Sequence, residues 1–199
     1  MTEKTAQKEP GKKPKPQQEV IVHVPLSRLH DFPNHPFKVR DDEAMLETAE
    51  SVKEYGVLVP ALARPREDGG YELIAGHRRK HACELAGLAT MPVIVRDIDR
   101  DAATIIMVDS NLQRENILPS ERAKAYKMKM EAIKRQGART DLTSPKISAK
   151  FRSDDEIGQD AGVSGDTIRN YIALTQLVPE LQQMVDEKKI ALSPAYQLA

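Results

Sequence analysis

The sequence predicts an α+β protein in which a small mixed α/β domain is followed by an all-α domain containing a helix-turn-helix. Three observations lead to this prediction. Between residues 19 and 96, short β-rich runs alternate with segments of helical periodicity. After about residue 101 the strand signals stop and only helical patterns remain. Residues 153–174 then show the glycine and apolar spacing of two short helices joined by a tight turn.

The charge of the chain is balanced in total but uneven along its length. The 199 residues include 30 basic and 30 acidic side chains. The net charge is +3 over residues 1–18, −5 over 19–110, +6 over 111–150 and −4 over 151–199. A polyanionic partner is therefore compatible with a total of zero, because electrostatic fields act locally.

Composition excludes several classes of protein. No apolar run approaches the roughly 18 residues of a membrane span, and no secretory leader follows the first residues. The single cysteine, Cys83, can form neither an internal disulfide nor a four-cysteine zinc site. We expect a cytoplasmic protein without a membrane partner.

We divide the chain into three parts. Residues 1–18 are rich in lysine, proline and glutamine and are predicted to be a disordered basic tail, because they cannot bury enough apolar surface to order themselves. Residues 19–110 are predicted to form the α/β domain and residues 111–199 the helical domain.

The elements of the α/β domain follow from local patterns. Strands are predicted over residues 20–24, 58–64, 71–75 and 92–95. Asp41 or Asp42 is expected to cap a helix that ends at Gly56 and places Met45, Leu46, Ala49 and Val52 at helical spacing. A second helix is expected over residues 77–86, opened by Gly76 and followed by Gly87 at its C′ position.

The helical part begins with a helix over residues 102–112. A longer amphipathic helix is predicted over residues 119–136, with a proline in its first turn and Gly137 beyond its end. Residues 138–152 are predicted to be a basic, polar linker, and residues 153–199 to form three or four short helices.

The helix-turn-helix prediction rests on the order of small, apolar and capping residues. Gly158 allows two helices to cross closely, Gly162 suits a left-handed turn, and Ser164 is expected to cap the second helix. Ser153 and Glu156 form a capping-box pattern at the start of the first helix. The residues expected to face inward are Ile157, Ala161, Val163, Ile168 and either Tyr171 or Ile172.

The second helix of such a motif presents its outward residues to the major groove of DNA. These residues are Ser164, Gly165, Asp166, Thr167, Arg169 and Asn170. Arg169 suits guanine and Asn170 suits adenine, whereas Ser164 and Thr167 suit phosphates. An ordinary pair of packed helices is the alternative, because the segment is acidic. An aspartate at a groove-facing position such as Asp166 is also unfavourable, unless it accepts a hydrogen bond from a cytosine amino group. The net charge of +6 over residues 111–150 favours DNA.

A second group of residues indicates an anion site. The segment over residues 71–79 runs from a strand into Gly76 and then into a helix that begins with His77, Arg78 and Arg79. Amides of a helix N-terminus and guanidinium groups together bind phosphates. A solvated basic turn is the alternative at this point.

These two groups of residues, in this order, resemble the ParB family of chromosome and plasmid partition proteins. The resemblance covers residues 20–199. The matching stretches are residues 56–60 (GVLVP), 70–79 (GYELIAGHRR), 91–95 (MPVIV) and 110–115 (SNLQRE), and the helix-turn-helix followed by 177–181 (LVPEL).

The resemblance implies a ParB/sulfiredoxin-like α/β fold and a CTP-gated DNA clamp that uses Mg²⁺. The implied clamp is a homodimer that loads at a palindromic site in double-stranded DNA and associates with the nucleoid or a plasmid. The implied nucleotide contacts are Gly76, His77, Arg78, Arg79, Asn111, Gln113 and Arg114, with Asn111 also at the metal. A ParA-type ATPase is the implied protein partner, with Lys12 and Lys13 as candidate contacts.

Two residues depart from the family pattern. His77 and Ser110 stand where the family usually has glutamate, and Mg²⁺ prefers carboxylate oxygens. Asp109 would point about 100° away from Ser110 on a helix. We therefore expect nucleotide binding with weak or absent hydrolysis, at most a weak CTPase, and assign no catalytic residue. A protonated His77 is a candidate donor to phosphate, and an ordinary surface histidine at the start of a helix is the alternative.

The expected function is sequence-specific DNA binding in the partition of a plasmid, a chromosome or a mobile element. One alternative is a phosphotransferase-type enzyme, because sulfiredoxin-like and serine-kinase-like proteins share the implied fold and a similar Gly-x-His-Arg motif. Cys83, however, does not follow Gly76 directly, where a sulfiredoxin-type nucleophile would lie. The other alternative is a DNA-binding regulator that needs no nucleotide.

Overall fold

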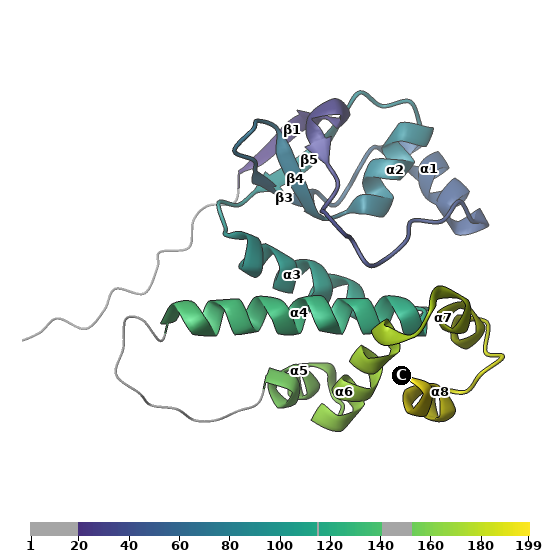
Figure 1. Cartoon of the computed structure of the whole chain (residues 1–199). Coiled ribbons are helices and arrows are strands. Elements are labelled where there is room, and N and C mark those ends of the chain that lie inside the picture. Colours follow the sequence, from purple (N-terminus) through teal and green to yellow (C-terminus); the bar gives the residue numbers. More distant parts are fainter. Residues whose placement is uncertain (1–19, 115, 141–152) are drawn as a thin grey trace, which may run out of the picture.

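A computed structural model describes residues 20–114, 116–140 and 153–199. Its first part is a five-stranded mixed sheet with the strand order β1-β5-β3-β4-β2 (Figure 1). The strands are β1 (Ile21–Pro25), β2 (Leu29–His30), β3 (Ala61–Pro65), β4 (Tyr71–Ala75) and β5 (Thr90–Val95). β1 and β5 pair antiparallel, as do β3 and β4, whereas β3 and β5 pair parallel, as do β2 and β4.

Helices cover both faces of the sheet. The helices α1 (Glu43–Tyr55) and α2 (His77–Leu85) pack on one face, around Leu73 and Val93. The helix α3 (Arg100–Leu112) packs on the other face, around Ile74. Because neighbouring residues of a strand point to opposite faces, Leu73 and Ile74 of β4 belong to two separate cores.

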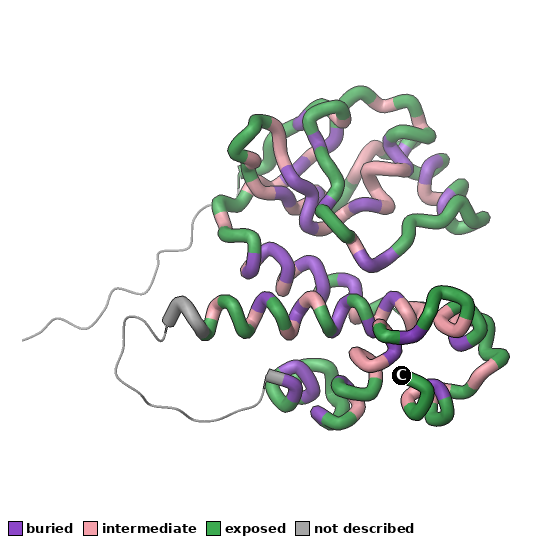
Figure 2. The backbone as a smooth tube through the Cα atoms, in the orientation of Figure 1, coloured by how far each residue is buried: buried purple, intermediate pink, exposed green. Residues whose placement is uncertain are grey.

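The second part is all-helical. Its helices are α4 (Pro119–Thr140), α5 (Ser153–Ala161), α6 (Gly165–Ala173), α7 (Pro179–Asp186) and α8 (Leu192–Leu198). Short 3₁₀ turns are η1 (Leu26–Arg28), before β2, and η2 (Leu174–Gln176), after α6. Figure 2 shows that α3 is buried along most of its length, between the sheet and α4. The opposite side of α4 supports α5 and α6, so α3 and α4 connect the sheet to the helix-turn-helix.

The predicted fold class is confirmed, and several element boundaries are correct. Asp42 caps α1 by accepting a hydrogen bond from the Met45 amide, and Gly56, with φ +72°, ends that helix. Gly87 follows α2 with φ +71°. The segment over residues 153–199 contains four α-helices, within the predicted number.

Other details differ from the prediction. β3 begins at Ala61 and not at Leu58, which is exposed, and Leu46 is also exposed on α1. α4 continues through Gly137 to Thr140, because a glycine with open space around it does not stop a helix that its neighbours support. The boundary that we drew after residue 110 falls inside α3. The predicted tail over residues 1–18 and most of the predicted linker, residues 141–152, lie outside the described residues.

None of the helices in the described part of the chain is long and apolar enough to span a membrane.

Candidate nucleotide site and helix-turn-helix surface

Gly76 directs the chain from β4 into α2. Its φ of +112° lies in a region that residues with a side chain rarely adopt. A Cβ at this position would also lie 2.8 Å from the Cβ of Ala61 on β3. Glycine is therefore required at position 76 for two reasons, its backbone conformation and its close contact with β3. This contact places the N-terminus of α2 against the sheet.

A cationic pocket of about 500 Å³ lies between the start of α2, the end of α3 and the segment before α1. It brings together three of the predicted nucleotide contacts: Arg78, Gln113 and Arg114. It also contains residues that the sequence analysis missed: Phe37, Lys38, Arg40, Asp42, Asn116, Ile117 and Glu121. Four cationic side chains and two carboxylates thus line one cavity of a size suited to phosphate groups.

The two carboxylates of the cationic pocket already have partners. Asp42 lies 3.4 Å from a terminal nitrogen of Arg78. Glu121 is buried and accepts hydrogen bonds from the amides of Lys38, at 3.1 Å, and Leu118, at 3.3 Å. Glu121 therefore ties the start of α4 to the segment before α1 and closes one side of the cationic pocket.

Arg114 lies on the rim of the cationic pocket beside another cation. Burial and the charge of Arg78 both lower the pKa of Arg114, whereas Glu121 raises it. Two guanidinium groups that repel each other in a partly buried cavity gain stability from an anion placed between them. The electrostatics of the cationic pocket therefore favour a phosphate-bearing ligand.

Asn111, the implied metal contact, is not among the residues that line the cationic pocket, but it has a side-chain oxygen that is unpaired within the described part of the chain. Its side chain is buried in α3, and its Nδ2 atom donates to the Met107 carbonyl at 2.8 Å. Its Oδ1 atom is buried and has no hydrogen-bond partner among the described residues. An amide oxygen is a ligand that Mg²⁺ accepts. The described residues contain no group of three or more His, Cys, Asp or Glu side chains arranged for a metal.

Arg79 does not join the cationic pocket. One terminal nitrogen of Arg79 donates to the carbonyls of Val59 and Pro60, each at 2.6 Å, and burial lowers the pKa of this arginine. Arg79 therefore holds the α1–β3 loop in place. A phosphate contact by Arg79 would require both bonds to break.

His77 is buried and is not the protonated donor that we expected. Its ring lies 3.9 Å, between centroids, from the ring of His35. Burial, followed by the charge of His35, lowers the pKa of His77 to about 3. His77 is therefore neutral at physiological pH, and the prediction of a protonated phosphate donor is wrong.

A smaller cavity of about 220 Å³ adjoins the cationic pocket, and Phe37 lines both. Its lining residues are Asp31, His35, Phe37, Val39, His77, Lys80, His81 and Glu84. The Nδ1 atom of His35 lies 2.7 Å from the Phe37 carbonyl, which can only accept, so Nδ1 holds the proton. Burial lowers the pKa of His35, and its Nε2 atom, buried without a partner among the described residues, presents a lone pair.

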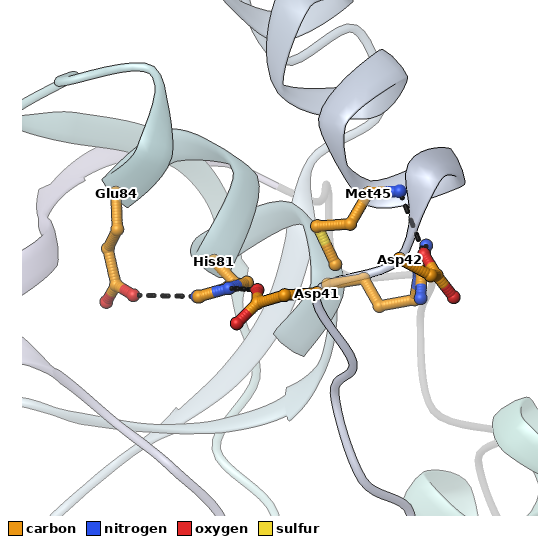
Figure 3. Close-up of polar contacts among 6 residues, drawn as sticks. Asp41, Asp42, Met45, His81 and Glu84 are labelled. Carbon is orange, nitrogen blue, oxygen red and sulfur yellow. Dashed lines mark hydrogen bonds and ion pairs between the residues drawn. The ribbon is translucent and has the colours of Figure 1, made fainter.

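His81 closes the outer side of this smaller cavity. Figure 3 shows its ring between the carboxylates of Asp41 and Glu84. His81 lies 2.5 Å from Asp41 and 3.4 Å from Glu84. The hydrogen bond to Asp41 raises the pKa of His81. This ion pair joins α2 to the start of α1, next to the Asp42 cap (Figure 3).

Asp109 does not take the place of the glutamate that the family usually has at position 110. The hydroxyl of Ser110 donates to the Met107 carbonyl at 3.0 Å. Asp109 faces α4, where it accepts from Lys129 at 2.7 Å, and this agrees with the predicted direction. Cys83 is buried, and burial raises its pKa, so its thiol is not an activated nucleophile.

The helix-turn-helix is formed by α5 and α6, which pack on α4. Ile157 and Ile168 are fully buried, together with Tyr126 of α4. The Oγ atom of Ser164 accepts from the Thr167 amide at 3.2 Å, and Gly162 has φ +68°. A Cβ on Gly158 would lie 2.6 Å from the Val163 carbonyl oxygen, so the close crossing of the helices is confirmed.

Three details of this motif differ from the prediction. Ala161 is exposed and does not face inward, and Val163 is 38% exposed and does not fill the corner. Gly165 is buried against Asp155 and is not on the outward face, because the start of α6 packs directly on α5. The Ser153 side chain lies outside the described residues. Of the other outward candidates, Ser164, Asp166, Arg169 and Asn170 are exposed and Thr167 is half-buried.

The fold and these two surfaces define a protein whose α/β domain contains a cationic pocket and is joined through α3 and α4 to a helix-turn-helix. Residues 11–112 match the family model described as the ParB N-terminal domain. The chain belongs to the ParB family.

Two relatives extend the likeness beyond the first domain. The chromosome-partitioning protein Spo0J of Thermus thermophilus is 34% identical over 171 residues, which are 85% of this chain and 56% of the relative. The C-terminally truncated ParB of Caulobacter crescentus, complexed to the centromeric parS site, is 28% identical with a TM-score of 0.57. That likeness covers 88% of this chain and 82% of the solved chain.

A Pnob8-like ParB-N domain shares the fold, with 18% identity, a TM-score of 0.60 and coverage of 90% of this chain and 79% of that one. The chain spans about half the length of the curated relatives that it matches.

Proposed function

We propose that this chain is the nucleotide-binding and DNA-binding part of a ParB-like partition protein. The observation that supports this most strongly is that one chain holds both the cationic pocket and the helix-turn-helix, in the order found in ParB. The likeness to the C. crescentus protein bound to parS spans both parts.

DNA is proposed to bind through α6. In this proposal, Arg169 and Asn170 contact base edges, and Ser164 and Thr167 contact phosphates. A palindromic, centromere-type site would be bound by a homodimer, because each half-site takes one helix-turn-helix. Asp166, which is exposed, is a candidate acceptor for a cytosine amino group.

A ParA-type ATPase remains the proposed partner, through Lys12 and Lys13 in the tail that lies outside the described residues. A nucleoid or plasmid location, for a chromosome, a plasmid or a mobile element, follows from this reading.

A nucleoside triphosphate is proposed to bind across the two adjoining cavities. Its phosphates would lie between Arg78 and Arg114, and its nucleoside in the smaller cavity beyond Phe37. CTP is the nucleotide that the ParB resemblance implies. The bare Nε2 atom of His35 is suited to accept a hydrogen bond from the amino group of such a base. Mg²⁺, held partly by Asn111, would neutralise phosphate charge.

Hydrolysis is proposed to be weak or absent. The positions of the two missing glutamates hold a neutral, buried His77 and Ser110, whose hydroxyl is bonded to its own helix. Bound nucleotide would then act as a signal that closes a clamp around DNA, and its slow turnover would keep the clamp closed.

A DNA-binding regulator that needs no nucleotide is the second candidate. Arg79, one of the implied phosphate contacts, is held by two backbone carbonyls, and this favours the second candidate. The phosphotransferase alternative gains nothing from the structure, because Cys83 is buried and protonated.

Titration calorimetry with CTP, ATP, GTP and UTP, with and without Mg²⁺, separates the two candidates. We expect selective CTP binding by the wild type and its loss in Arg114→Ala. Arg66→Ala is the matched control, because it removes the same charge at an exposed ion pair with Asp68. Absence of binding by every nucleotide would support the regulator. Tight binding by Arg114→Ala would refute the assigned phosphate site.

A further inference from the structure

Arg169, on the outward face of α6, is held by two carboxylates. One terminal nitrogen donates to Asp154 in the first turn of α5, and the other donates to Asp166 one turn earlier on α6. The two partners differ in burial, because the Asp154 side chain is 10% exposed and the Asp166 side chain is 78% exposed. Arg169 itself is 43% exposed, so part of its guanidinium still faces solvent.

The burial of Asp154 makes it the stronger of the two partners. An exposed ion pair such as the one with Asp166 is screened by water and contributes little. A buried carboxylate that loses its partner is left with an uncompensated charge, which is costly. The Arg169 guanidinium is therefore anchored by Asp154 and only assisted by Asp166.

Arg169 is also the only lysine or arginine within residues 153–174. A free arginine on a DNA-facing helix binds phosphates at any sequence, because this attraction is purely electrostatic. Because Asp154 and Asp166 both lie at the Arg169 guanidinium, the three side chains together carry a net negative charge. This charge opposes contacts between Arg169 and DNA phosphates. The two terminal nitrogens nevertheless each keep a second N–H, and guanine offers two acceptors, O6 and N7, to such a fork.

We infer that Asp154 is a specificity-determining positioning residue. It orients the Arg169 guanidinium toward a base edge and prevents this group from binding phosphates. This inference rests on the proposed DNA binding by α6. Without the Asp154 charge, Arg169 gains both rotamer freedom and uncompensated positive charge. Sequence-specific binding then weakens while binding to unrelated DNA strengthens.

The experiment measures binding of the full chain to two duplexes by fluorescence anisotropy over a series of salt concentrations. One duplex is selected by the wild type from a random-sequence pool, and the other is a scrambled version of it. Asp154→Asn is expected to lower the ratio of the two affinities by about tenfold, through weaker binding to the first duplex and tighter binding to the second. Glu156→Gln, an equal charge change at an exposed α5 residue outside the Arg169 ion pairs, should leave the ratio within about twofold of wild type.

Arg169→Lys provides a second variant, because it keeps the charge and removes the fork. It should lose discrimination at a single base pair, and Asp154→Asn should lose it at the same base pair. A ratio for Asp154→Asn equal to that of wild type or of Glu156→Gln, in a variant whose melting curve shows a folded protein, would overturn the inference alone. If the wild type enriches no sequence from the pool, the proposed DNA-binding function fails together with the inference.

Discussion

The buried, neutral state of His77 makes the stability of this protein depend on pH in a defined direction. Burial lowers the pKa of His77 to about 3, from an ordinary value of 6.5. Below about pH 6.5, His77 therefore becomes protonated in the unfolded chain but stays neutral in the folded chain until the pH approaches 3. The stabilising effect is complete above pH 6.5 and is lost progressively as the pH falls toward 3.

The size of the effect follows from the two pKa values. One pKa unit corresponds to about 1.4 kcal/mol, so a complete loss over the roughly 3.5 units between the two values would be on the order of 5 kcal/mol. Between pH 7.5 and pH 5, the same relation gives a loss of about 2 kcal/mol from His77 alone. The lowered pKa of His35 acts in the same direction, whereas the raised pKa of His81 acts in the opposite one.

Comparison with His77→Gln isolates the contribution of this one ring. Urea denaturation of both proteins at pH 7.5 and pH 5 gives their free energies of unfolding. The wild type should lose about 2 kcal/mol more than the variant over this interval, because His35 and His81 are present in both. Equal losses would show that the His77 ring is accessible to protons in the folded state and would refute its burial.

Two further predictions concern the packing of the helical part. Gly158→Ala should lower the free energy of unfolding by about 1–3 kcal/mol, because its Cβ would lie 2.6 Å from the backbone oxygen of Val163. Gly137→Ala, in open space on α4, should instead raise it by about 0.5–1 kcal/mol in the same urea assay, and a reversed order would refute this reading. Lys129 is fully buried and bonded to half-buried Asp109 and exposed Asp160. Lys129→Met should therefore cost less than about 1 kcal/mol, because it leaves no buried charge, whereas asparagine at both acidic positions should cost about 3 kcal/mol. Equal costs in urea denaturation would argue against a buried ammonium group.

The features that could be predicted from the sequence depend on neighbours along the chain. A cap at Asp42, left-handed glycines at Gly87 and Gly162, and a cap at Ser164 each follow from a few adjacent residues. These are the positions at which prediction and structure agree most closely. Gly76 belongs with them in part, since its need for a positive φ is local but its approach to β3 is not.

The composition of the cationic pocket depended instead on tertiary structure. Arg78 and Arg79 are neighbours, but adjacent helical residues point about 100° apart, so only one of them faces α3. Lys38 and Arg40 precede a capped helix, and Glu121 follows Pro119 in the next long helix. In the sequence these three residues are recognisable only as charged, and none of their neighbours along the chain indicates that they line one pocket.

The burial of His77 was missed for a related reason. A residue in the first turn of a helix is normally solvated, so the position of His77 in the sequence predicts an exposed ring. The segment around His35 folds over that turn and buries the ring, which no periodicity in residues 31–40 indicates.

The end of α3 is the structural link between the two proposed functions. Gln113, at the C-terminal end of this helix, lines the cationic pocket and also a cavity of about 600 Å³ beside α5. In the same cavity, Asp109 of α3 binds the buried Lys129, which in turn binds Asp160 of α5. We expect a ligand that displaces the last turn of α3 to act on α5 through this ion pair, because packed interiors transmit small displacements. Nucleotide and DNA are therefore expected to change each other's affinity by the same factor.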